Sequence, residues 1–392
     1  MWPAFQLRIE AKLVRDNNTR PERGARDRPV ASFLMPVYNA EAYLAEAVES
    51  ALGQTEKNIE VVAVDDGSTD SSREILRRYA GRDPRLRILE EEHRGLIAAL
   101  NRGLEVAQGE YICRLDADDI AMPDRVDRQV RFLQEHLDYV LVGGQVATIG
   151  SAGEDIGTVG TQFTGLDLAE YLKAGCCLVH SSVAFRRAEV LSAGAYDPLF
   201  VTVEDYDLWV RLVEDYRLAK LPEIVCKFRV HGDQVSVSRI LRQYLSTMCI
   251  RAAFRGATRE AIRDGVRADE KDFLKVLRQL GYSDDEIAAN LTNTFLHWTG
   301  RLRSAGNRES ASKLLLELKG YIQEMRCDSR FLAQAHWWHS RLSLDAHCYT
   351  TAAQFLFRAA ASSPRVAAKR LLGRLLAPLS SGRRRAEATL IR

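Results

Sequence analysis

Short apolar runs alternate with amphipathic segments in the first third of the chain. The predicted strands are residues 30–36, 59–65, 86–90 and 110–115, and the predicted helices are residues 39–54, 71–80 and 96–107. The first of these helices has Asn39 in the position of an N-cap. Strands and helices that alternate through short connections are typical of a parallel sheet with helices on both faces. The pattern therefore predicts an α/β domain, which binds ligands beyond the carboxyl ends of its strands.

The pattern changes near residue 239, after which helical spacing replaces the strand signals. Two later segments, 305–318 and 351–364, resemble halves of helix-turn-helix repeats, although any such repeat is degenerate. We therefore predict a flexible arm at 1–28, an α/β domain at 29–238, a helical accessory domain at 239–361 and a basic amphipathic tail at 362–392.

Two aspartates follow the strand predicted at residues 110–115. Asp116 and Asp118 are two residues apart, so both side chains can point to the same side of an extended segment. Paired carboxylates suit Mg²⁺ or Mn²⁺ that bridges a diphosphate. Taken alone, such a pair is more typical of a solvated turn or a helix cap than of a metal site, because Asp119 leads toward a helical segment.

Two further acidic segments carry candidate chemistry. Asp65 and Asp66 end a predicted strand, where their carboxylates can accept hydrogen bonds from a base or ribose; the alternative is a tight turn at Gly67. Glu204 and Asp205 open an amphipathic segment, where one carboxylate can serve as a general base for a hydroxyl group. The alternative there is an acidic first helical turn, which the helix dipole favours.

Together, four motifs resemble those of the family 2 glycosyltransferases in order and spacing. The motifs are Met35–Asn39, Val64–Asp70, Gly109–Asp119 and Glu204–Trp209. The resemblance covers about residues 30–238. It implies an inverting, nucleotide-sugar-dependent enzyme of GT-A fold, a Rossmann-like and mostly parallel sheet with helices on both faces, here followed by an all-α domain.

The resemblance also implies roles for individual residues. The nucleotide-sugar would contact Pro36, Val37, Tyr38, Asp65, Asp66, Asn101 and Asp116. The divalent metal, Mn²⁺ or Mg²⁺, would be held by Asp118, Asp116 and His231. Asp205 matches the catalytic base, and Glu204 is the alternative. Two of these assignments have simpler alternatives. Many members have an arginine directly before the asparagine of this helix, and this arginine is missing before Asn101. A loop histidine such as His231 is often an ordinary polar residue.

The resemblance further implies a single displacement with the metal as Lewis acid. The Gln-x-x-Arg-Trp motif and membrane helices of processive relatives are absent from the sequence, so we expect one sugar per acceptor. By resemblance, the donor is a UDP-sugar, the acceptor is a saccharide or a lipid-linked saccharide, and the setting is bacterial cell-surface polysaccharide synthesis.

Two alternatives are a nucleotidyltransferase, which would need a glycine-rich phosphate loop near residues 36–39, and an inactive GT-A domain in a helical interaction protein. The second would lack a metal or base carboxylate, and Asp116, Asp118 and Asp205 are all present.

Charge is distributed unevenly along the 392 residues. The whole chain has 55 Lys and Arg against 53 Asp and Glu, a net charge of +2. The tail at 362–392 has eight basic residues and one acidic residue, so it carries +7 and leaves −5 for residues 1–361. Residues 365–379 place leucines among the basic residues, which suits peripheral contact with an anionic membrane; a helix docked on its own domain is the alternative. Nucleic acid is not an expected partner, because aromatic residues do not interleave with the charges.

The composition and the apolar pattern of the sequence give an expectation for the cellular location of the protein. No apolar stretch approaches the roughly 18 residues of a membrane span, and residues 1–18 lack the pattern of a secretory signal. The seven cysteines form no CxxC pair, which favours reduced thiols. We therefore expect a cytoplasmic protein, or one at the inner face of the cell membrane.

Two histidine-containing segments remain. His180-Ser181-Ser182 either borders the acceptor pocket or flanks a strand. The segment 336–339, His-Trp-Trp-His, lacks further metal ligands, so its tryptophans are predicted to belong to the core or to an interface between domains.

Overall fold

A computed structural model describes residues 28–366, except 160–164, 166, 232–238, 326 and 346–348. The chain forms two compact units that divide between Gly281 and Tyr282. The division does not coincide with the boundary predicted after residue 238, because three helices beyond that residue belong to the first unit. The predicted N-terminal arm at 1–28 and basic tail at 362–392 lie almost wholly outside the described residues.

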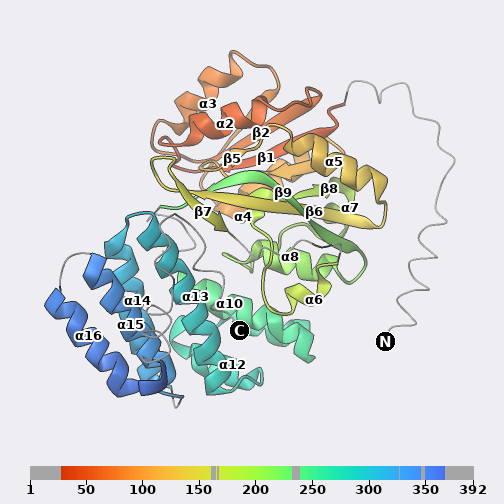
Figure 1. Ribbon diagram of the computed structural model, residues 1–392. Helices are drawn as coiled ribbons and strands as arrows, with labels where there is room; N and C mark the ends of the chain where they lie inside the picture. Colours follow the sequence, from red (N-terminus) through yellow and green to blue (C-terminus); the bar gives the residue numbers. More distant parts are fainter. Residues whose placement is uncertain are drawn as a thin grey trace. The chain divides into compact units, whose positions relative to one another are not determined.

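A mixed sheet forms the centre of the first unit (Figure 1). Its strands are β1 (Ala31–Val37), β2 (Ile59–Asp66), β3 (Leu86–Glu91), β4 (Tyr111–Arg114), β5 (Ile120–Ala121), β6 (Tyr139–Ile149), β7 (Asp155–Val159), β8 (Ala184–Arg186) and β9 (Arg217–Arg229). Their order is β3-β2-β1-β4-β8-β6-β9-β5, and β7 pairs with β6.

The first half of the sheet is parallel, as predicted. β1 lies between β2 and β4, β2 pairs with β3, and all three pairings are parallel. The second half is mixed: β8 is antiparallel to both β4 and β6, β5 is antiparallel to β9, and β6 runs parallel to β9. Because the carboxyl ends of β1, β2 and β4 share one edge, the acidic segments that follow them meet there.

Helices cover both faces of the sheet. The helices of the first unit are α2 (Leu44–Leu52), α3 (Ser72–Ala80), α4 (Leu96–Val106), α5 (Arg125–Glu135), α6 (Ala169–Leu172), α7 (Arg187–Ser192), α8 (Glu204–Leu212), α10 (Ile240–Arg251), α11 (Arg259–Arg267) and α12 (Phe273–Gln279). Phe33 packs in one cluster with Val48 of α2, whereas the neighbouring Leu34 lies against Gly103 of α4. Because successive residues of a strand point to opposite faces, this alternation places α2 and α4 on opposite sides.

The predicted N-cap of the first helix is wrong. Asn39 has a left-handed backbone with φ of 47°, and its Oδ1 accepts a hydrogen bond of 2.8 Å from the Thr69 backbone N–H. The helix α2 begins only at Leu44, after a turn. Asparagine tolerates this backbone region better than most residues, so it joins the loops after β1 and β2 instead of capping a helix.

Charged contacts attach α11 to the rest of the first unit. Asp207 of α8 is fully buried and pairs with Arg211 at 3.0 Å and with Arg259 of α11 at 2.5 Å. Asp197 pairs with Arg263, also on α11. A buried carboxylate needs such partners, so α11 is part of the fold that surrounds α8.

The second unit contains α13 (Asp284–Ser304), α14 (Arg308–Glu324), α15 (Arg330–Asp345) and α16 (Tyr349–Ser362). Helix α15 packs against α14 and α16. Of the two tryptophans predicted to belong to the core or to an interface, Trp337 is buried and Trp338 is only partly buried. His336 and His339 lie on the same helix and stack on Phe355 of α16. Within the described residues, every helix is too short or too polar to cross a membrane.

Candidate active site

Three aspartates gather in the turn after β4. Asp116, Asp118 and Asp119 each offer an oxygen within 4.8 Å of the others. Asp119 is fully buried; its Oδ1 accepts a hydrogen bond of 2.8 Å from the Arg229 backbone, and its Oδ2 has no partner among the described residues. Burial, and after it the charges of Asp118 and Asp116, raise the pKa of Asp119 well above its usual value. An unsatisfied buried oxygen within an all-carboxylate set fits a divalent cation, which would supply the missing positive charge.

Two buried arginines hold this turn in place. Arg229, at the end of β9, donates from Nε to the Asp118 carbonyl at 2.9 Å and from Nη2 to Glu46 of α2 at 2.5 Å. Arg114, at the end of β4, pairs with the Asp116 carboxylate. The turn is therefore fixed from both sides before any ligand arrives, which reduces the entropy lost on binding.

His231 joins the same cluster. Its Nε2 lies 3.0 Å from Asp118 Oδ2, and its ring is 5.4 Å from that of Tyr43. The structure thus brings together Asp116, Asp118 and His231, the residues that the sequence predicted for the metal. Asp119 was not among the predicted ligands, although it is the third aspartate of the motif 116–119.

The predicted nucleotide-binding carboxylates lie at the carboxyl end of β2 and hold neighbouring loops. Asp65 is buried, pairs with Arg73 at 2.7 Å and accepts the Ser68 backbone N–H at 3.1 Å. Asp66 accepts the backbone N–H groups of Arg94 at 2.7 Å and Gly95 at 2.9 Å. Both carboxylates therefore hold loops in place at the carboxyl edge of the sheet. A nucleoside bound there would contact carboxylates that already accept these protein hydrogen bonds.

An aromatic pair lies beside these carboxylates. Pro36 and Val37 are buried in β1, but Tyr38 is 47% exposed and stacks on His93 with ring centroids 4.1 Å apart. His93 Nδ1 is also 2.9 Å from Asp66 Oδ2. His93 was not predicted, since a single histidine between β3 and α4 gives no signal in the sequence.

Asn101 of α4 holds the segment that leads to α8. Its Oδ1 accepts the Tyr196 backbone N–H at 3.0 Å, and its Nδ2 donates to the Tyr196 carbonyl at 2.8 Å. Both ends of the amide are thus engaged by the protein. A direct contact of Asn101 with the donor stays a prediction.

The predicted base residues open α8. Glu204 is 5% exposed, and its Oε2 has no partner among the described residues. Asp205 accepts the Tyr206 backbone N–H at 2.6 Å, and its Oδ2 lies 3.7 Å from the Cys176 thiol. Burial, and after it the charge of Asp205, raise the pKa of Glu204 to about 8, whereas burial raises the pKa of Asp205 to about 6. At neutral pH, Asp205 is the ionised member of the pair and so the better proton acceptor.

The 3-10 turn η2 (His180–Ser182) connects the base residues to the acidic turn. His180 Nδ1 lies 3.9 Å from Glu204 Oε1, and the next residue, Ser181, donates from Oγ to Asp116 Oδ2 at 2.9 Å. The predicted alternatives for His180, a pocket border or a strand flank, did not include this link. Because adjacent residues contact both acidic groups, the two groups belong to one site.

A buried arginine of α5 fixes η2 to the sheet. Arg125 donates to the carbonyls of Arg114 at 2.8 Å, Ser181 at 2.7 Å and Val183 at 2.9 Å. Its burial lowers its pKa, and the three carbonyls compensate for the lost hydration. No sequence pattern marks Arg125 for this function.

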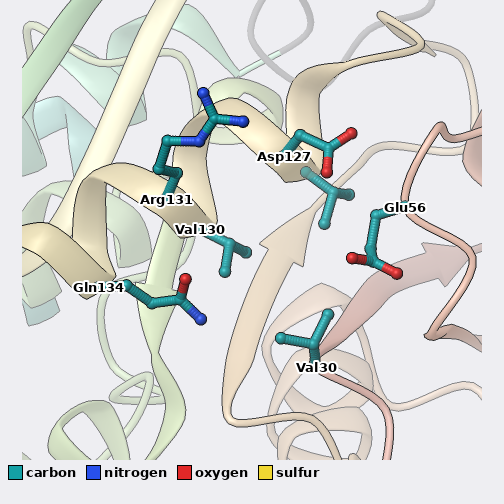
Figure 2. Close-up of a pocket in the computed structure, with 7 residues that line it drawn as sticks. Val30, Glu56, Asp127, Val130, Arg131 and Gln134 are labelled. Atoms are coloured by element: carbon teal, nitrogen blue, oxygen red, sulfur yellow. The ribbon is translucent and has the colours of Figure 1, made fainter.

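A separate hollow of about 150 Å³ lies at the other end of the strands (Figure 2). Val30, which precedes β1, lines it together with Glu56 and with Asp127 and Arg131 of α5. The carboxyl ends of β1 and β4 are at the opposite end of the sheet from Val30. This hollow is therefore not the candidate active site.

Comparisons with known proteins agree with the motifs. Residues 32–190 match the family model for glycosyl transferase family 2. An uncharacterized glycosyltransferase of Haemophilus influenzae is 33% identical over 217 residues, which cover 54% of this chain and 80% of that protein. The chain belongs to glycosyltransferase family 2. The putative glycosyltransferase EpsE of Bacillus subtilis is 32% identical and covers 52% of this chain and 74% of its own length.

Another relative is named for its pathway. The amylovoran biosynthesis glycosyltransferase AmsE of Erwinia amylovora is 31% identical over 212 residues, covering 53% of this chain and 79% of that protein. The predicted family, GT-A fold and enzyme class are thereby confirmed for this glycosyltransferase, as is the helical extension that follows the fold.

Proposed function

We propose that this family 2 glycosyltransferase is an inverting, non-processive enzyme that transfers one sugar from a nucleotide sugar, preferentially a UDP-sugar, to a hydroxyl of a saccharide or lipid-linked acceptor. One observation carries the proposal. The turn η2 joins Asp116 of the acidic turn to Glu204, which precedes the proposed base Asp205 at the start of α8; this link supports one site for the diphosphate and the base.

The acidic turn is the diphosphate side of this site. Asp116, Asp118, Asp119 and His231 are the residues that would hold Mn²⁺ or Mg²⁺. When bound, the cation supplies positive charge for the developing negative charge of the nucleoside diphosphate. Arg229 and Arg114 keep the carboxylates in position before the donor binds.

Asp205 is the base of the reaction. Its carboxylate takes the proton of the acceptor hydroxyl while that oxygen forms a bond to the anomeric carbon. The bond from the anomeric carbon to the phosphate oxygen breaks with its electron pair on the departing diphosphate, and attack from the opposite face inverts the configuration. Protonation of the leaving group by a carboxylic acid, as in glycoside hydrolysis, is not required.

The nucleoside would lie over the ends of β1 and β2. The exposed ring of Tyr38, supported from behind by His93, offers a surface for base stacking. Asp65 and Asp66 supply acceptors at the same edge. Asn101 would contribute through the backbone of Tyr196, which it holds.

The biological setting is proposed from relatives. AmsE is named for amylovoran biosynthesis, which supports bacterial cell-surface polysaccharide synthesis as the setting. A lipid-linked acceptor would place the enzyme at the inner face of the cell membrane, where the basic tail at 362–392 would contact anionic lipids.

Thermal-shift binding tests the proposal. UDP, GDP, CDP and dTDP are added with and without Mn²⁺ to the wild type, to Asp118→Ala and to Asp124→Ala, a partly exposed aspartate outside the cluster that pairs with Arg128. We expect one nucleotide, UDP, to stabilise the wild type by roughly 2.7 kcal/mol at about 100 times its Kd, only with the metal. The shift should disappear in Asp118→Ala and persist in Asp124→Ala. A wild type that no nucleotide stabilises would contradict the proposal and favour the interaction-protein alternative.

A further inference from the structure

A histidine between β3 and α4 is tied to the strand end where the nucleoside is proposed to lie. The Nδ1 atom of His93 is 2.9 Å from Asp66 Oδ2 and 3.0 Å from the Asp66 carbonyl oxygen. Both oxygens are hydrogen-bond acceptors, so Nδ1 carries a proton and donates it to Asp66. The imidazole is therefore attached to the carboxyl end of β2 by its own side chain.

The backbone around His93 is fixed to the same strand end. The Asp66 carboxylate accepts the N–H groups of the two residues that follow His93, Arg94 at 2.7 Å and Gly95 at 2.9 Å. Gly67 lies so close that an added Cβ would be 2.7 Å from the His93 backbone nitrogen, and its φ of 72° is one that residues with a side chain rarely adopt. His93 therefore cannot move away from β2 without the loss of several contacts.

The fixed imidazole covers one face of an exposed tyrosine. The rings of Tyr38 and His93 have centroids 4.1 Å apart and planes inclined by 23°. The residue after Tyr38 is also bound to the loop after β2, because the Asn39 backbone N–H donates to Ser68 Oγ at 3.0 Å. With His93 against it, Tyr38 is still 47% exposed, so the side of the ring away from His93 is open to a ligand.

We propose that His93 is a positioning residue for the nucleoside, which holds the Tyr38 ring in the orientation on which the base stacks and through which Asp66 contributes to nucleotide affinity. This inference rests on the proposed stacking of the base on Tyr38. An exposed tyrosine without such support samples several rotamers, and a ligand that selects one of them binds at a cost in entropy. His93 removes this cost before the nucleotide arrives.

The contacts of the imidazole decide between two places for the base. A base that took the place of His93 on Tyr38 would have to break the contacts between Nδ1 and Asp66, whereas a base on the open side of Tyr38 leaves them intact. The two arrangements predict opposite effects when the imidazole is removed. Nucleotide affinity falls if His93 supports the ring, and it rises if His93 competes with the base.

Isothermal titration calorimetry of the whole chain tests the inference, with UDP and with inorganic pyrophosphate, each in the presence of Mn²⁺. His93→Asn keeps a donor near the position of Nδ1 and lacks the aromatic ring, whereas His93→Phe keeps a ring and lacks the donor. Tyr38→Ala is measured alone and combined with His93→Asn. Pyrophosphate has no base, so it reports on the acidic turn alone, and thermal melts confirm that each variant is folded.

We expect His93→Asn to raise the Kd for UDP about 3- to 10-fold, and His93→Phe to fall between this variant and the wild type. Tyr38→Ala should raise the Kd about 10- to 100-fold, because the base loses its stacking surface. Adding His93→Asn to Tyr38→Ala should change the Kd less than about twofold, since His93 acts through Tyr38. The Kd for pyrophosphate should stay within about twofold of the wild type in every variant.

An unchanged or lower Kd for UDP in folded His93→Asn would overturn the inference, and so would a His93→Phe variant that binds UDP no better than His93→Asn. Equal weakening of UDP and pyrophosphate, or a full effect of His93→Asn in the Tyr38→Ala background, would also overturn it. A wild type that does not bind UDP, or a Tyr38→Ala variant that binds it as tightly as the wild type, would instead contradict the proposed nucleoside site. The inference and the proposed function therefore fail by different results.

Discussion

At the scale of single residues, neighbours along the chain acquire different properties from their surroundings. Glu204 and Asp205 are adjacent carboxylates, yet Glu204 is buried with one oxygen that has no partner in the described part of the chain, and Asp205 accepts a backbone hydrogen bond. The motif predicted that one of them is the base. Only the tertiary contacts distinguish the two, because burial acts on each side chain separately.

Substitution of the two carboxylates should therefore give different results. Asp205→Asn is expected to lower kcat at least about 10²-fold, because the hydroxyl proton loses its acceptor. Glu204→Gln, which mimics the protonated state, should retain activity within about tenfold.

Wild-type activity should fall as the pH decreases through about 6, where Asp205 takes up a proton, and be retained above it. Steady-state kinetics between pH 5 and 8 check this, and the reverse order of activity losses would assign the base to Glu204.

At the scale of elements, the acidic turn is correctly placed because β4 packs closely on β1. Gly109, which precedes β4, leaves no room for a side chain: an added Cβ would lie 2.5 Å from the Ser32 backbone nitrogen. Ser32 Oγ in turn accepts the Gly109 N–H at 2.9 Å and donates to Glu60 at 2.6 Å. The glycine thus permits the pairing that carries Asp116 to the edge of the sheet.

Gly109→Ala is expected to destabilise the protein by about 1–3 kcal/mol, because backbone must move to relieve the overlap. Gly320→Ala in α14 is the matched control, since nothing lies within 4 Å of its added Cβ and alanine favours helices. Urea denaturation measures both free energies of unfolding. Equal stability of the two variants would show that the close approach at Gly109 does not limit the fold.

At the scale of the whole molecule, the first unit extends beyond the region of family resemblance. The resemblance ends near residue 238, but α11 supplies arginine partners to Asp207 and Asp197. Gln243 of α10 also donates to the Thr202 carbonyl at 3.1 Å, just before the base residues. The helices α10 to α12 therefore complete the transferase unit.

Truncation should reveal this difference. A chain that ends at Gly281 is expected to remain folded and to keep its nucleotide-dependent thermal shift, whereas one that ends at residue 238 leaves buried Asp207 with a single arginine and should lose both. In the full chain, Arg259→Ala should cost about 1–3 kcal/mol for the same reason. Circular dichroism and thermal melts compare the proteins. A stable, nucleotide-binding chain of 238 residues would contradict this assignment of the helices.

The sequence by itself determined the parallel half of the sheet, the helical character of the last third, the family and the identity of the acidic residues. These features depend on residues that are close along the chain, where periodicity and motif spacing are visible. The tertiary structure decided the antiparallel half of the sheet, the extent of the first unit and the partners of each carboxylate. Arg229 and Asp119 are 110 residues apart, and His180 and Glu204 meet through a turn with no periodic pattern. Such contacts arise only when the packed sheet brings distant segments together, because burial and charge pairing depend on proximity in space.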